Sequence, residues 1–133
     1  YTLSLAANAN NSVDTLDLLL SRGAQLEDSG ALQNAALYDR LLSVKLLLNR
    51  GAKIDEIPAT NPGDERDCDN GTALHRAVYG SAVDVVEFLL GKGADMRILD
   101  QMGRTVMAIA ERRKGEEKME KIIKLLMDAE AKL

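Results

Sequence analysis

The chain has 133 residues and a formal net charge of -4, a length that suits one domain with its own hydrophobic core. The acidic balance argues against a general binder of nucleic acid or anionic membranes, because such surfaces need an excess of lysine and arginine. A single cysteine, Cys68, and a single histidine, His75, exclude a disulfide framework and a Cys/His zinc cluster within the chain. No apolar run approaches the length of a membrane span. We therefore expect an intracellular protein, cytoplasmic or nuclear.

The first unit, residues 1–27, combines an apolar stretch at 1–7 with the segment TLDLLLSRGAQ at 15–25. Both stretches return later in the chain in altered form. Tyr1 stands where the third and fourth units have threonine, and the turn that should precede it is absent. Because a terminal repeat needs a polar outer face, we expect either that further repeats precede Tyr1 or that a cap covers this edge.

The second unit, residues 28–56, contains GALQNAA at 30–36 and SVKLLLNRGAK at 43–53. An insertion at 57–68 follows, which holds both prolines of the chain and is rich in aspartate and glutamate. Proline fixes φ and removes a backbone donor, so the insertion predicts an extended loop and not a helix. This acidic loop is either a docking site for a basic partner or a solvated connection.

The third unit, residues 69–99, is the most regular. The pair Asn70-Gly71 predicts a turn, and within 72–80 the apolar side chains recur at i, i+3 and i+4, as on one face of a helix. Gly93 fits a helix C-cap in the left-handed conformation, where a residue without Cβ has no steric penalty. The second helix of this unit is predicted to bury Val83, Val86, Leu89 and Leu90.

The fourth unit, residues 100–133, opens with DQMGRT at 100–105 and continues with TVMAIAE at 105–111. Its second half, IIKLLMDAEAK at 122–132, lacks the glycine of the other units and is flanked by charged residues. A charged outer face on a degenerate repeat predicts a C-terminal cap. Arg112 and Arg113 fall at the end of its first helix, where they either contact an acidic partner or are simply solvated.

The spacing and the motifs together point to one family. The equivalent alanines Ala77 and Ala110 are 33 residues apart, and TALHRA at 72–77 resembles the ankyrin signature T-P-L-H-x-A with alanine for proline. DQMGRT also matches the ankyrin hairpin pattern D-x-x-G-x-T. The chain resembles an ankyrin-repeat protein of about four repeats, the first incomplete and the last a cap. This resemblance implies an all-α fold, a single ankyrin-repeat solenoid of stacked helix-turn-helix units joined by β-hairpin-like loops.

The resemblance also implies a function and a surface. Ankyrin repeats bind protein partners through the concave face of hairpin tips and first helices, and His75 would have a structural role, hydrogen-bonded to Thr72 and neighbouring backbone. We expect a monomeric domain with a protein partner and without nucleic acid, membrane or cofactor. The expected partner-binding residues are Asp69, Asn70, Gln101, Met102 and Arg104 at the tips, and Tyr38, Tyr79, Arg112 and Arg113 on the first helices.

Other functions compete with this one. The chain would alternatively be a regulatory or spacer segment of a larger multidomain protein that docks on its own neighbouring domain. Catalysis is not expected, because no glycine-rich phosphate loop follows a strand and no metal-ligand spacing occurs. A calcium loop beginning at Asp67 fails because Val78 stands where the closing carboxylate is needed. The two tyrosines have a simpler role open to them, that of covering the seams between repeats.

Overall fold

A computed structural model describes residues 17–18, 20–23, 30–57 and 71–132 of the chain. Within these residues the structure contains helices and no strand, which confirms the predicted all-α class. None of these helices is long and apolar enough to cross a bilayer. In chain order they are α3 (Ala31–Leu37), α4 (Leu41–Asn49), α5 (Ala73–Tyr79), α6 (Val83–Gly91), α7 (Val106–Arg112) and α8 (Glu117–Ala131).

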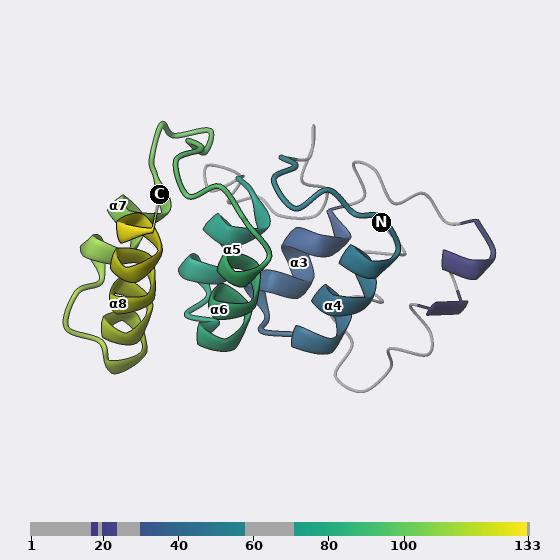
Figure 1. Cartoon of the computed structure of the whole chain (residues 1–133), viewed down its shortest axis with the longest axis horizontal. Helices are drawn as coiled ribbons and strands as arrows, with labels where there is room; N and C mark the ends of the chain where they lie inside the picture. Colours follow the sequence, from purple (N-terminus) through teal and green to yellow (C-terminus); the bar gives the residue numbers. More distant parts are fainter. Residues whose placement is uncertain (1–16, 19, 24–29, 58–70, 133) are drawn as a thin grey trace.

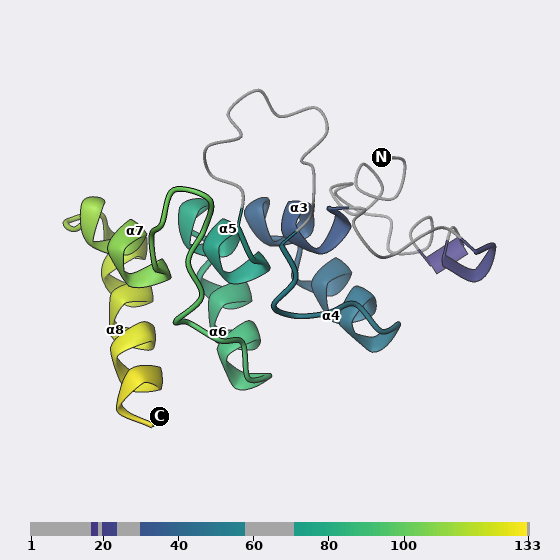
Figure 2. The ribbon, with the colours of Figure 1, turned by 90° about the horizontal axis from the view of Figure 1, so that it is seen from above.

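The helices form antiparallel pairs that stack side by side. Helices α3, α5 and α7 make one row, and α4, α6 and α8 make a second row behind it (Figure 2). Each first helix contacts the second helix of its own unit, and α5 lies between α3 and α7 (Figure 1). The helix pairs predicted for the second, third and fourth units are therefore present and stacked as a solenoid, while most of the first unit lies outside the described residues.

Small side chains let the first helices pack closely. Ala35, Ala77 and Ala110 are each fully buried where the first helices meet, and the second helices fill the remaining core with larger aliphatic groups. The prediction for α6 was wrong in detail, because Val85 is fully buried while Val83 and Leu90 are only partly buried. The fully buried large side chains of the second helices are Val44, Leu47, Val85, Val86, Leu89, Met119, Ile122 and Leu126.

The turn from the first to the second helix has the same geometry in two units. Asp39 after α3 and Ser81 after α5 both adopt left-handed backbone, with φ of 58° and 57°. In each turn the next amide closes the helix, as when Ala82 N–H donates to the Ala77 carbonyl at 2.9 Å. Because a side chain is strained in this region, these two positions store conformational energy that glycine would not.

The second helices end as predicted, on glycine. Gly93 has φ of 88°, its amide donates to the Leu90 carbonyl at 3.1 Å, and the Ala94 amide donates to the Leu89 carbonyl at 3.0 Å. This pair of bonds is the Schellman arrangement, which satisfies carbonyls at the end of α6. Gly51 ends α4 in the same way, so the glycines at 51 and 93 each mark the stop of a second helix.

A close backbone approach between α3 and α5 leads to the first prediction. A Cβ placed on Gly80 would lie 2.1 Å from the Leu37 carbonyl oxygen, whereas a Cβ on Gly91 would meet nothing within 4 Å. Gly80→Ala must push two units apart, and we expect it to lower the free energy of unfolding by about 3 kcal/mol. Gly91→Ala, at the end of α6, should raise it by about 0.5 kcal/mol through helix propensity. Urea unfolding of both variants measures whether the free energy of unfolding falls for Gly80→Ala and rises for Gly91→Ala. An unchanged midpoint for Gly80→Ala would contradict the packing described.

The left-handed turn at Ser81 gives a second prediction. The Ser81 Oγ is buried and has no hydrogen-bond partner among the described residues, in addition to the strained φ. Ser81→Gly removes both the unpaired hydroxyl and the backbone strain. It should raise the free energy of unfolding by about 1 kcal/mol, after allowing for the greater backbone entropy of glycine in the unfolded chain. Ser81→Ala removes only the hydroxyl and should raise the free energy of unfolding by a smaller amount. Thermal unfolding compares the three proteins; if the glycine variant melts no higher than the parent chain, the turn is not strained.

Candidate functional site

The loop before α7 is built around one buried carboxylate. Asp100 Oδ1 accepts hydrogen bonds from the Met102 and Arg104 amides, both at 2.9 Å, and the Asp100 amide donates to the Arg104 carbonyl at 2.9 Å. Gly103, with φ of 72°, completes the turn. The tip therefore has a fixed backbone, and it presents Gln101 and Met102 outward, with Met102 59% exposed.

Arg104 is held by the same carboxylate. Its Nε and Nη2 lie 3.0 and 2.9 Å from Asp100 Oδ2, and the arginine side chain is 20% exposed. Charge-assisted pairing of this fork-like kind fixes a guanidinium in one orientation. Of the three predicted tip residues described, Gln101 and Met102 face solvent, while Arg104 braces the tip from below.

His75 joins the third unit to this tip. Its Nδ1 accepts from the Thr72 amide at 3.2 Å, which leaves the ring proton on Nε2, and Nε2 donates to the Arg104 carbonyl at 3.0 Å. Thr72 caps α5 in return, since its Oγ1 accepts from the His75 amide. The ring is 1% exposed, so the predicted structural role of His75 is confirmed.

Gln33 forms the corresponding hydrogen bond one unit earlier. It occupies the position of His75 in the repeat alignment, is 5% exposed, and its Nε2 donates to the Glu56 carbonyl at 2.9 Å. The sequence reasoning did not single out Gln33. Aligning GALQNAA with TALHRAV places the two side chains together and would have found it. The bridge from one unit to the following loop thus occurs twice, with two different side chains.

The remaining predicted residues lie at the opposite end of the first helices. Tyr38 is the C-cap of α3, Tyr79 is the last residue of α5, Arg112 is the last residue of α7 and Arg113 is its C-cap. The tyrosines are 45% and 38% exposed. A helix of this length rises about 10 Å, and that distance separates this row of helix ends from the tip. The predicted site is therefore two patches and not one.

Arg113 is engaged within the protein. Its Nη1 donates to the Tyr79 carbonyl at the end of α5, and its Nε and Nη2 lie 3.2 and 2.8 Å from the two oxygens of Glu116. A cation at a helix C-terminus is favourable because unpaired carbonyls gather there. Arg113 therefore joins the third and fourth units, whereas Arg112 is exposed.

Other sequence predictions fall outside the described residues. Asp69 and Asn70 lie there, as does the inserted loop apart from position 57. Among the residues that the structure does describe, no group of three or more histidine, cysteine or carboxylate side chains could hold a metal ion.

Burial lowers the pKa of His75 below its ordinary value of 6.5, and this gives a third prediction. Below that pH the unfolded chain binds a proton that the folded chain resists, so stability falls as the pH drops through 6.5 toward the folded pKa. The slope is at most about 1.4 kcal/mol per pH unit for one proton. Urea unfolding between pH 5.5 and 7.5 should show this loss in the parent chain. His75→Gln, which copies Gln33, should show a flatter profile; identical profiles would exclude His75 as the cause.

Comparison with known proteins agrees with this geometry. A family model described as ankyrin repeats, in three copies, matches residues 57–133, which is more than half of the chain. A search of curated proteins gave no match. Ankyrin repeats are a non-catalytic fold that generally serves protein–protein interaction. With the stacked helix pairs, the 33-residue spacing and the matching model together, the chain belongs to the ankyrin-repeat family.

Proposed function

We propose that this domain binds a protein partner through the concave face, with the tip of the fourth unit as its central contact. The supporting observation is that Met102 is 59% exposed although the backbone beneath it is fixed by the buried Asp100. A flexible thioether on a rigid support presents apolar area with little backbone ordering on binding.

The helix-end patch extends this surface. Tyr38 and Tyr79 each combine an apolar ring with a polar hydroxyl, the type of side chain that dominates binding energy at interfaces. Arg112 is exposed and adjoins Arg113, which donates to the Tyr79 carbonyl, so it adds a positive charge to this patch and favours an acidic contact on the partner. A partner that reaches both patches must lie along the first helices.

Arg104 and Arg113 have supporting roles in this proposal. Arg104 is paired with Asp100, and Arg113 with Glu116 and the end of α5, so each shapes a patch that other residues present. Asp69 and Asn70 are included in the proposed surface from their place in the sequence motif, shortly before Thr72. The proposed contact residues are Tyr38, Asp69, Asn70, Tyr79, Gln101, Met102 and Arg112.

A matched pair of methionines makes the fourth prediction. Met102 at the tip and Met127 on α8 are 59% and 58% exposed, so truncation removes similar apolar area at each. Protein captured from cell extract by the intact chain is identified, purified and titrated against both variants. Met102→Ala should weaken binding about tenfold, as expected for a central contact, and Met127→Ala should leave it unchanged.

The tyrosines are tested in the same assay. The double variant Tyr38→Ala/Tyr79→Ala should also weaken binding if the partner spans both patches. If the partner binds the parent chain, the Met102 variant and the tyrosine variant with equal affinity, the concave face is not the binding surface. The result would then favour a domain that docks through another surface.

A further inference from the structure

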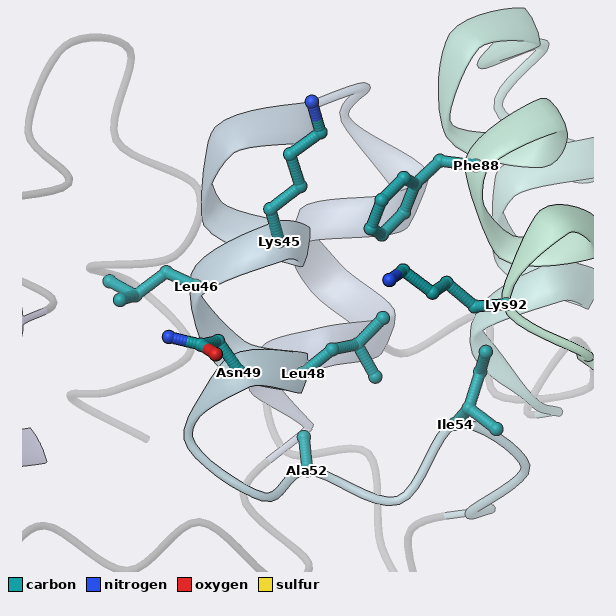
Figure 3. A pocket seen from close by; sticks show the side chains of 8 residues that line it. All are labelled: Lys45, Leu46, Leu48, Asn49, Ala52, Ile54, Phe88 and Lys92. Atoms are coloured by element: carbon teal, nitrogen blue, oxygen red, sulfur yellow. The ribbon is translucent and has the colours of Figure 1, made fainter.

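The row of second helices carries a groove that the proposed function does not use. It is an open hollow of about 840 Å³, lined by side chains of α4, of the loop after α4 and of the C-terminal end of α6. Figure 3 shows Leu48, Ile54, Phe88 and Lys92 directed toward the space between the helices, whereas Leu46 and Asn49 lie on the other flank of α4. The floor is therefore apolar, and α4 and α6 pack less closely here than α6 and α8 do.

Two lysines from different units meet at the single phenylalanine of the chain. Lys45 Nζ lies 5.5 Å and Lys92 Nζ 5.6 Å from the centroid of the Phe88 ring, which is cation–π distance. Both lysines are exposed, and neither is in an ion pair within the described part of the chain. In a protein with a net charge of -4, this is a local positive site beside an apolar floor.

Carboxylates lie beside the two lysines on one side of the groove. Asp84 and Glu87 line a shallower hollow that adjoins the groove and shares Phe88 and both lysines. Among the described residues, those that line the groove itself include no carboxylate. An anionic ligand is thus attracted where both lysines meet Phe88 and is repelled toward Asp84 and Glu87, which gives the site a direction. The same two acids disfavour a polyanion such as nucleic acid, whose phosphates would run past both ends.

We propose that this groove binds a short acidic peptide segment of a partner protein, one that carries an apolar side chain between carboxylates. The apolar side chain contacts Leu48, Ile54 and the Phe88 ring, and the carboxylates pair with Lys45 and Lys92. Charge complementarity selects this occupant, because the two ammonium groups repel each other until an anion lies between them. The site is on the second helices and is separate from the tip surface.

The experiment is an NMR titration of the isotope-labelled chain with the synthetic peptide EELFEE. Signals of Phe88, Leu48 and Ile54 should shift to saturation. The peptides QQLFQQ and EEAAEE, which lack the carboxylates or the apolar side chains, should bind more weakly. Lys45→Gln/Lys92→Gln should weaken EELFEE binding about tenfold, from the loss of two partly exposed charge pairs. Lys45→Arg/Lys92→Arg keeps both charges and should keep most of the affinity.

Controls separate this proposal from its alternatives. Lys121→Gln/Lys124→Gln makes the same change of charge on α8 and should leave peptide binding intact, as should Met102→Ala at the tip. The proposal is wrong if EELFEE leaves the groove signals unmoved, or binds the parent chain and the Lys45/Lys92 glutamine variant equally. It is also wrong if the groove signals shift with protein concentration alone, since the occupant would then be a second copy of the chain.

Discussion

The first helices lie so close together that a single methyl group does not fit between them at Gly80. The Leu37 carbonyl occupies that space, and the buried alanines along α3, α5 and α7 preserve the same separation over the whole row. Most of the fully buried large aliphatic side chains among the described residues lie on the second helices, and Leu74 and Val78 of α5 join them in the core. The separation of the first helices also sets the spacing of the helix ends that carry Tyr38, Tyr79 and Arg112.

The repeat pattern predicted most of this architecture because the relevant interactions are local. Helical spacing located the pairs, Gly93 marked a helix end, and the TALHRA motif placed Thr72 and His75 at the start of α5. Each of these features depends on residues within a few positions of one another. The errors concerned which residues of a helix face the core, as where Val85 is fully buried in place of Val83.

Sequence patterns could not predict the contacts between units or the charge pair within the tip loop. Nothing in the sequence indicates that Arg113 donates to the carbonyl of Tyr79, or that Arg104 is paired with a buried Asp100, because charged residues in loops are usually solvated. The groove at Phe88 was equally hidden, since Lys45 and Lys92 belong to different units and meet only when the units stack. The candidate contact residues stay a prediction, and their division into exposed and supporting residues needed the structure.

The bridge from His75 to the Arg104 carbonyl gives the stack a direction. Gln33 reaches forward to the Glu56 carbonyl in the loop after α4, and His75 reaches forward to the Arg104 carbonyl in the loop before α7. The equivalent position of the fourth unit is Ala108, whose methyl group cannot form such a bond. If α7 and α8 detach while the rest stays folded, the His75 ring loses its acceptor and gains access to water. Its proton exchange and titration would then report the opening of the last unit alone, so the chain carries its own spectroscopic sensor of partial unfolding at that end.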